Sequence, residues 1–155
     1  MNLSEIDFRI NTAQYETLVE HFILSADSFN PPLSTYINVD LYAKKILENA
    51  ITFEAWSGEK LIGLVATYFN NFHTKIGFVT NLSLLKEYQG IGIASLLMIN
   101  VINYGGDNGF VRVDLEVKKI NTKAIKFYKK KGFIEAGQNK DCLLMTYDIN
   151  NTKKF

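Results

Sequence analysis

The chain has 155 residues, of which 47% are hydrophobic and only two are prolines. This length and composition predict one domain with a packed core, covering residues 1–155. Its 17 basic and 16 acidic residues leave a net charge of +1, which excludes a strong electrostatic attraction to nucleic acid or to an anionic membrane surface.

The cysteine and histidine content argues against a metal centre. Cys142 is the single cysteine, so neither a disulfide framework nor a cysteine metal cluster can form within the chain. His21 and His73 are far apart and show no ligand spacing. We therefore expect no metal.

The sequence also lacks signals for export or membrane insertion. The amino terminus contains acidic residues and no apolar signal core, and no apolar run reaches the about 20 residues that span a bilayer. We expect a cytoplasmic protein with no membrane partner.

Two helices are expected in the first third of the chain, after a short strand from Glu5 to Ile10. The first helix covers Thr12 to about Asp27, and the break "NPPLS" (residues 30–34) separates it from the second, Val39 to Asn49. The first helix has an apolar face of residues spaced three and four apart, formed by Tyr15, Leu18, Val19, Phe22, Ile23 and Ala26.

Three strands follow as an antiparallel meander. Ile51–Ser57 and Lys60–Phe69 flank Gly58 and Glu59, which are typical of a tight hairpin. The third strand, Lys75–Leu85, is expected to place its large apolar residues on one face of the sheet; these are Ile76, Phe78, Leu82 and Leu84.

The last part of the chain alternates helices and strands. We expect a buried helix from Ile93 to Tyr104, stopped by "GGDNG" (residues 105–109). A strand at 111–117 precedes a helix that Asn121 caps and Gly132 ends, and two strands follow near 133–138 and 142–149. The element order predicts the α+β class: a mixed, mostly antiparallel sheet with helices on both faces.

The stretch "YQGIGIASLL" (residues 88–97) places Gly90 and Gly92 where a strand gives way to a helix. Bare glycines leave backbone N–H groups exposed at the positive end of the helix dipole, an arrangement that binds phosphate oxygens. No Gly-Lys-Ser/Thr triplet or third glycine follows, so NTPase and dinucleotide loops do not match. From these residues alone, a tight turn that binds nothing remains an alternative.

The residues from Gly77 to Phe133 resemble the Gcn5-related N-acetyltransferase (GNAT) superfamily. "QGIGIA" (residues 89–94) is similar to its Gln/Arg-x-x-Gly-x-Gly/Ala signature, with Gln89 in place of the commoner arginine. "NLSLLKEYQGIGIASLLM" (81–98) and "LEVKKINTKAIKFYKKKGF" (115–133) are similar to the family's strand, loop and helix segments. The resemblance implies the GNAT fold, in which the fourth strand carries a bulge and separates from the fifth.

The resemblance also implies acetyl-CoA as a co-substrate. The pantetheine arm would pair with the backbone near Leu82, Ser83 and Leu84, and Asn121 would contact it or act only as a helix cap. The pyrophosphate would be held by backbone amides of residues 89–95, which are Gln89, Gly90, Ile91, Gly92, Ile93, Ala94 and Ser95.

Two catalytic residues follow from the same resemblance. Tyr128 would give a proton to the leaving thiolate, and a backbone N–H near Leu84 would polarise the carbonyl. Glu116 is the candidate general base, in a layout similar to the ribosomal-protein N-terminal acetyltransferases. Alternatives stay open: a surface ion pair for Glu116, a water ordered by Asn81, or the carboxylates of Glu54 and Asp114.

The expected function is acetyl transfer to a primary amine of a small molecule by direct attack, in an acetyl-CoA-dependent N-acetyltransferase. Residues 29–36 and 70–73 are poor in acids, which disfavours a polycationic acceptor; His73 either touches the acceptor or is a solvated turn residue. An N-terminal peptide acetyltransferase and a non-catalytic acyl-CoA sensor are the alternatives. The resemblance also makes a homodimer possible.

Overall fold

The computed structural model describes residues 2–26 and 38–150, and the expected break at residues 30–34 lies outside them. The described residues form a seven-stranded sheet of order β1-β2-β3-β4-β5-β7-β6. In chain order the elements are η1 (Leu3–Glu5), β1 (Asp7–Ile10), α1 (Tyr15–Leu24), α2 (Val39–Asn49), β2 (Ile51–Ser57), β3 (Lys60–Tyr68), β4 (Ile76–Leu84), η4 (Lys86–Tyr88), α3 (Ile93–Asp107), β5 (Arg112–Lys118), α4 (Thr122–Lys130), β6 (Ile134–Gln138) and β7 (Cys142–Asp148).

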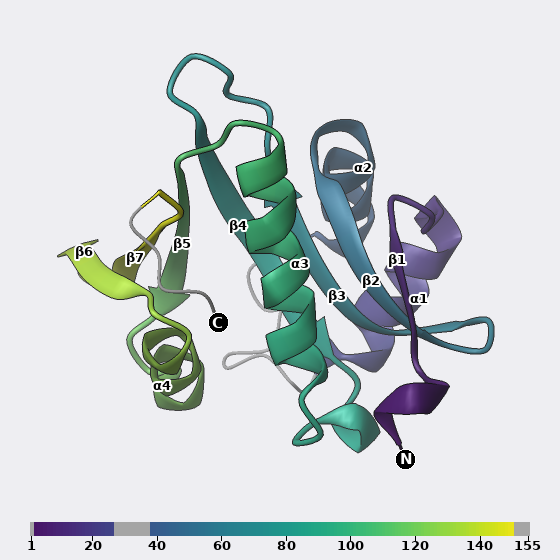
Figure 1. Cartoon of the computed structure of the whole chain (residues 1–155). Helices are drawn as coiled ribbons and strands as arrows, with labels where there is room; N and C mark the ends of the chain where they lie inside the picture. The colour runs from purple at the N-terminus through teal and green to yellow at the C-terminus, as the bar shows by residue number, and fades with distance from the viewer. Residues whose placement is uncertain (1, 27–37, 151–155) are drawn as a thin grey trace.

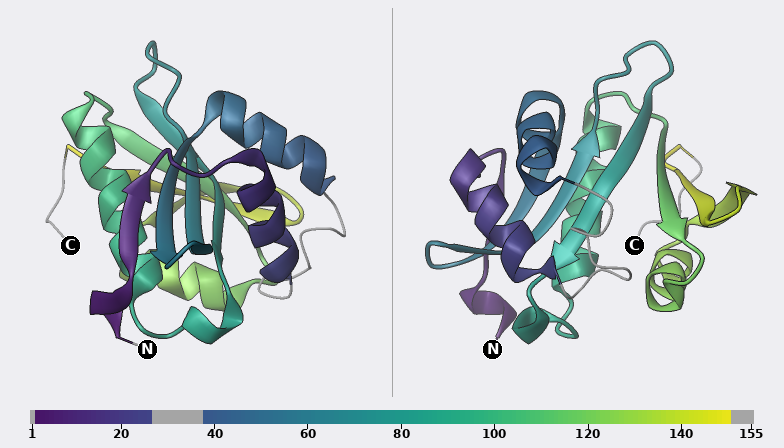
Figure 2. Two further views of the ribbon diagram at one scale, coloured as in Figure 1. Left: turned by 90° about the vertical axis from the view of Figure 1, so that its right-hand side faces the viewer. Right: turned by 180° about the vertical axis from the view of Figure 1, so that it is seen from behind.

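The sheet has helices on both faces, as the sequence predicts. β1 to β4 are antiparallel neighbours, β4 and β5 are parallel, β7 is antiparallel to β5, and β6 is antiparallel to β7 at the edge of the sheet. α3 lies across one face, and α1 and α2 cover the other (Figures 1 and 2). This arrangement is the mixed, mostly antiparallel α+β sheet that the sequence predicts. Among the described helices, none is long and apolar enough for a membrane crossing.

α1 buries most of the expected stripe, because Leu18 and Phe22 are buried and Tyr15 and Val19 pack against the same core cluster. Its buried residues are Leu18, His21 and Phe22, and Ser25 follows on the same stripe. Ile23 is 63% exposed, so its assignment to the apolar face is wrong. His21 can lie on this buried stripe because its ring nitrogens find hydrogen-bond partners in the sheet, as described below.

A bulge in β4 changes the face to which its side chains point. Ala66 pairs with Asn81 while Thr67 pairs with Val79, so Thr80 is the extra residue. On one side of the bulge, Ile76 and Phe78 lie beside α2 residues. On the other, Leu82 and Leu84 pack against the core cluster under α3. The expectation that all four share one face is therefore wrong.

α3 continues beyond its expected end at Tyr104. It includes Gly105 and Gly106 and ends at Asp107, and Gly109 follows with φ of +82°. A Cβ at Gly105 would lie 3.1 Å from Phe69 and Ile149. The glycines therefore allow close packing inside the helix, and Gly109 supplies the left-handed residue after it.

Candidate active site

β4 and β5 are paired for only part of their length. The parallel register runs from the Ile76–Arg112 pair to the Val79–Leu115 pair and ends there. β4 continues through the bulge to Leu84, still paired with β3. The β5-facing edge of β4 beyond the bulge therefore presents backbone N–H and C=O groups that no strand covers.

A cleft of about 520 Å³ occupies the space between the separated strands. The ends of β4 and β5, the start of α3 and the face of α4 line it. The cleft brings together every residue that the sequence analysis assigned to the site except Ile91; these are Leu82, Ser83, Leu84, Gln89, Gly90, Gly92, Ile93, Ala94, Ser95, Glu116, Asn121 and Tyr128. Ile91 instead packs its side chain against the core.

The N-terminus of α3 has no side-chain cap, unlike those of α2 and α4. Asn38 accepts a hydrogen bond from the Leu41 amide and Asn121 from the Ala124 amide, whereas the cap of α3 is Gly92. Between residues 38 and 150, the amides from Gly90 to Ser95 meet no hydrogen-bond acceptor. These donors lie at the positive end of the helix dipole. They can therefore bind an anion.

The conformation of the loop requires its glycines. Gly90 has φ of +83° and Gly92 of +96°, values that residues with a Cβ adopt at a cost. A Cβ at Gly90 would meet no atom within 4 Å, so the space above this backbone is open. The donor set and this open space fit the pyrophosphate of coenzyme A.

Tyr128 reaches the cleft from α4. It is 7% exposed, and among the described residues no hydrogen bond to its hydroxyl is seen. Burial raises the pKa of Tyr128 above its ordinary value, so the phenol stays protonated at neutral pH. The side chain can therefore donate a proton into the cleft.

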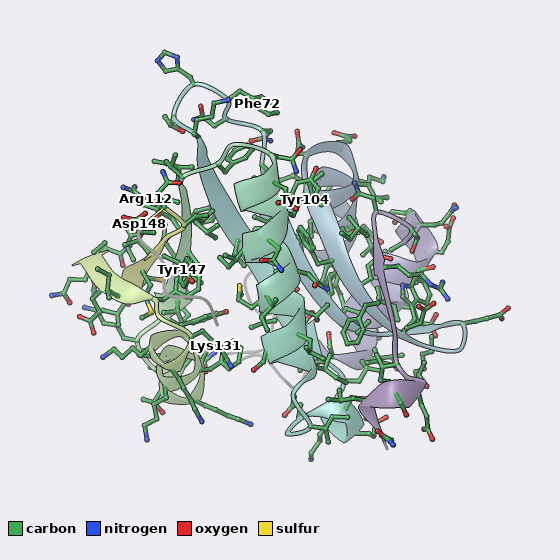
Figure 3. All side chains as sticks on the ribbon, in the orientation of Figure 1. Phe72, Tyr104, Arg112, Lys131, Tyr147 and Asp148 are labelled. Carbon is green, nitrogen blue, oxygen red and sulfur yellow. The ribbon has the colours of Figure 1, made fainter. Side chains whose placement is uncertain are left out.

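Glu116 lies on β5, at the exposed rim of the same cleft. The expected alternative, a surface ion pair, forms between other residues of the strand: Arg112 Nε lies 2.9 Å from Asp114 Oδ1. Figure 3 shows Arg112 beside Asp148, away from the end of β5 that meets α4. Within the described residues, Glu116 takes part in no such pair.

The two other carboxylates considered as bases have structural partners. Glu54 is fully buried and accepts hydrogen bonds from the amides of Thr12 and Ala13, at 2.9 and 3.0 Å. It thereby fixes the connection between β1 and α1. Asp114 accepts from Arg112 and, at 2.6 Å, from the Thr146 hydroxyl. Neither lines the cleft, so the geometry excludes both as direct bases.

The hairpin between β3 and β4 lies at the far end of the sheet from the glycine loop. Phe72 marks it in Figure 3, and His73 there is exposed. Asn70 and Asn71 line a separate hollow beside α2 that shares no residue with the cleft. The expected contribution of residues 70–73 to acceptor binding therefore has no support in the geometry, and residues 29–36 lie outside the described residues.

Sequence reasoning missed His21, which is 1% exposed under the cleft. Its Nδ1 lies 2.9 Å from the Leu61 carbonyl oxygen and its Nε2 lies 2.7 Å from Ser83 Oγ. Burial lowers the pKa of His21 to about 4, although the bond to Leu61 opposes this shift. His21 is three residues after the buried Leu18, so the two lie on the same helix face. This spacing was the sequence signal that could have predicted its burial.

The comparisons with known proteins agree with this geometry. The model of the acetyltransferase (GNAT) family matches residues 16–133. Searching the curated proteins yields no match.

Solved structures with this fold are similar over most of their length. PaiA N-acetyltransferase from Thermoplasma acidophilum, in complex with coenzyme A, is 16% identical over 92% of this chain and 99% of its own, with a TM-score of 0.73. A ribosomal-protein alanine N-acetyltransferase from Escherichia coli is 21% identical over 92% and 94%, with a TM-score of 0.73. A chimera of spermidine N-acetyltransferase SpeG from Vibrio cholerae and hSSAT is 20% identical over 94% and 96%, with a TM-score of 0.74. At these identities the likeness shows the fold alone.

The buried His21 predicts a loss of stability in mild acid. An unfolded histidine takes up its proton near pH 6.5, whereas folded His21 does so only near pH 4. The free energy of unfolding should therefore be unaffected by His21 above pH 6.5 and should fall by about 3 kcal/mol as the pH drops to 4. Urea unfolding at stepped pH values measures this fall.

The control is His21→Gln, which cannot titrate in this range. It should be less stable near neutral pH but lose less stability than the wild type between pH 6.5 and 4. Equal losses in the two proteins would contradict the assignment of the proton uptake to His21.

Proposed function

Since the chain belongs to the acetyltransferase (GNAT) family, we propose that it transfers the acetyl group of acetyl-CoA to a primary amine of a small molecule by direct attack. The observation that carries this proposal is the cleft between β4 and β5, which has anion-binding amides at one end and Tyr128 and Glu116 in its walls. Bound acetyl-CoA supplies a thioester whose C–S bond breaks as an amide bond forms to the amine.

The coenzyme would be held mostly by the backbone. Amides from Gly90 to Ser95 would bind the pyrophosphate, and the free edge of β4 from Leu82 to Leu84 would pair with the amides of the pantetheine arm. Asn121 Oδ1 caps α4, which leaves its Nδ2 to contact that arm. Among the described residues lining the cleft, Lys118 and Lys123 are the cations, and their charge favours a polyanion.

Tyr128 would act as the general acid. Thiolate departure is assisted by a proton held nearby, and the unpaired, protonated phenol in the cleft wall meets this requirement. An N–H near Leu84 would stabilise the oxygen that gains charge during attack.

An ammonium has no lone pair, so the acceptor must lose a proton before it attacks. Glu116 is our candidate for this base because it is exposed at the cleft rim and carries the sole carboxylate among the described lining residues. A water bound by the amide of Asn81 is the alternative, since Asn81 also lines the cleft.

The charge of the cleft supports a small acceptor with little positive charge. The described lining of the cleft contains one carboxylate and two lysines. This balance of charge does not favour binding of a polyamine, which is strongly cationic. A peptide amino terminus is the second candidate, favoured by the placement of Glu116 and Tyr128 together in the cleft wall. Binding of acyl-CoA without turnover, as a sensor, is the third.

The first prediction concerns the coenzyme loop. Gly90→Ala and Gly109→Ala place a methyl group at φ of +83° and +82° respectively, in each case with no atom within 4 Å. Both should lose about 1 kcal/mol of stability. Only Gly90→Ala should weaken acetyl-CoA binding, by about tenfold, as measured by calorimetry. Equal affinities in the two variants would remove the loop from the coenzyme site.

The second prediction tests turnover and the general acid. Free thiol should appear steadily when acetyl-CoA is mixed with a panel of small primary amines, and more slowly with peptides. Tyr128→Phe should lower kcat by roughly 100-fold, the range for loss of a general acid, with acetyl-CoA affinity unchanged. Tyr104→Phe, on α3 outside the cleft, is the control. Coenzyme binding without thiol release from any amine would support the sensor instead.

The third prediction concerns the base. Glu116→Gln should remove the limb of the pH–rate profile that reports the ionisation of the base, and should lower kcat/KM. Glu135→Gln, an exposed carboxylate on β6 that pairs with Lys129, should leave the profile unchanged. A profile that keeps its limb in Glu116→Gln would transfer the task to water bound at Asn81.

A further inference from the structure

Three side chains form a continuous hydrogen-bonded line from α1 to the cleft. His21 Nδ1 bonds to the Leu61 carbonyl, His21 Nε2 lies 2.7 Å from Ser83 Oγ, and Ser83 Oγ lies 2.8 Å from Asn81 Oδ1. The three residues are 1%, 3% and 4% exposed, respectively. Ser83 and Asn81 line the cleft and His21 does not. We call this line the His21–Ser83–Asn81 chain.

Counting protons fixes the direction of every bond in this chain. The Leu61 carbonyl can only accept, so Nδ1 of His21 carries a proton. In the neutral ring Nε2 is then an acceptor, and the single hydroxyl proton of Ser83 is donated to it. The Ser83 oxygen can now only accept from Asn81, and the donor of a carboxamide is its NH₂ group. The two ends of a carboxamide have the same shape and are told apart only by their partners. The proton count therefore assigns the NH₂ group to the position facing Ser83, in place of the Oδ1 that lies there.

The neutral state of the ring follows from its surroundings. His21 is enclosed by α1, β3 and β4, and its ring contacts the Leu61 carbonyl, Ser83 and the Phe22 ring. Among the described residues no carboxylate stabilises a positive charge on it. A charge buried without such a partner is costly, so the neutral ring is favoured.

We propose that His21 and Ser83 are positioning residues that turn the amide oxygen of Asn81 toward the cleft, where it accepts a hydrogen bond from the acceptor amine. The inference rests on the proposed function and extends it to the acceptor. The amide atom of Asn81 that does not face Ser83 has no partner within residues 38–150. An oxygen there can accept an N–H from the amine, whereas an NH₂ group would compete with that N–H.

This arrangement selects the kind of amine. A neutral primary amine has two N–H groups and one lone pair. It can donate to Asn81 and to a second acceptor in the cleft, such as Glu116, and keep its lone pair for attack. A secondary amine has one N–H and must give up one of these bonds. We therefore expect primary amines to be preferred over secondary amines of similar size.

His21 is better suited to positioning than to accepting the proton of the amine. The Ser83 hydroxyl already donates inward to Nε2, so the ring presents no free lone pair to the cleft. A general base is most effective when its pKa lies near the working pH, and burial moves the pKa of His21 well below it. His21 acts on the amine only through Ser83 and Asn81.

Two substitutions of His21 separate positioning from packing. The amide of His21→Gln reaches the position of Nε2 and can accept the Ser83 proton. The amide of His21→Asn reaches the position of Nδ1 and can bond Leu61 but not Ser83. Both variants should lose stability and bind acetyl-CoA as the wild type does. His21→Asn should raise KM for the amine about 3- to 10-fold, the effect of one neutral hydrogen bond, with kcat little changed, while His21→Gln should keep KM near the wild-type value.

Ser83→Ala is the smaller change if the His21 variants fold poorly, and it should raise KM as His21→Asn does. In an Asn81→Ala background, His21→Asn should add no further increase, because the group that it positions is gone. Equal KM values in His21→Asn and His21→Gln, or a full additional increase in the double variant, would overturn the proposal.

Nitrogen-15 NMR of histidine-labelled wild-type protein tests the chain without any acceptor. We expect His21 at neutral pH to carry its proton on Nδ1 and none on Nε2. A doubly protonated ring or the opposite tautomer would overturn the orientation of Asn81. If this pattern is found but no amine is acetylated, the proposed function fails and with it the role toward an amine, whereas the orientation stands.

Discussion

The separation of β4 from β5 beyond the Val79–Leu115 pair is the constraint on which the candidate site depends. A sheet normally satisfies the backbone groups of a central strand on both sides, and here one side is left uncovered for the rest of β4. The bulge at Thr80 accompanies this departure and reverses the direction of the following side chains. One irregularity therefore produces both the edge that can pair with a ligand and the presentation of Asn81 and Ser83 in the cleft.

The energetic cost of these unsatisfied groups is the physical reason to regard the cleft as a binding site. α2 and α4 each have an asparagine that caps the first turn, whereas α3 begins with a glycine whose neighbours leave their amides without acceptors. Uncapped amides at a helix terminus are stabilised by an anion, and a free strand edge is stabilised by an amide-bearing ligand. Acetyl-CoA has both features, and PaiA, which shares this fold, was solved with coenzyme A.

Two buried polar residues, Glu54 and His21, contribute by holding the elements around the cleft in place. Glu54 and His21 are both almost inaccessible, and each is stabilised by hydrogen bonds rather than by charge pairing. Glu54 gathers donors from β2 and the β1–α1 connection, which fixes the entry of α1. His21, about two helix turns along α1 from that entry, then meets β3 and β4 at a defined position. Satisfied polar networks of this kind specify a single arrangement of the elements around them.

The sequence by itself determined the features that depend on neighbouring residues. The bounds of α2 (Val39–Asn49), the glycines at 90 and 92 and the cap at Asn121 depend on local signals, and the structure has each where it was expected. Their physical basis is the backbone conformation and capping preference of a few adjacent residues. The resemblance of residues 77–133 to the GNAT family added the fold, which the comparisons confirm.

Tertiary structure alone decided the features that depend on contacts between distant segments. His21 and Ser83 are 62 residues apart, and no local pattern indicates that they meet. The burial of Glu54, the reversal of faces at Thr80 and the continuation of α3 through Gly105 likewise depend on partners from other elements. Burial and hydrogen-bond partners are properties of the packed chain, so a residue's chemical role is set only when its neighbours in space are known.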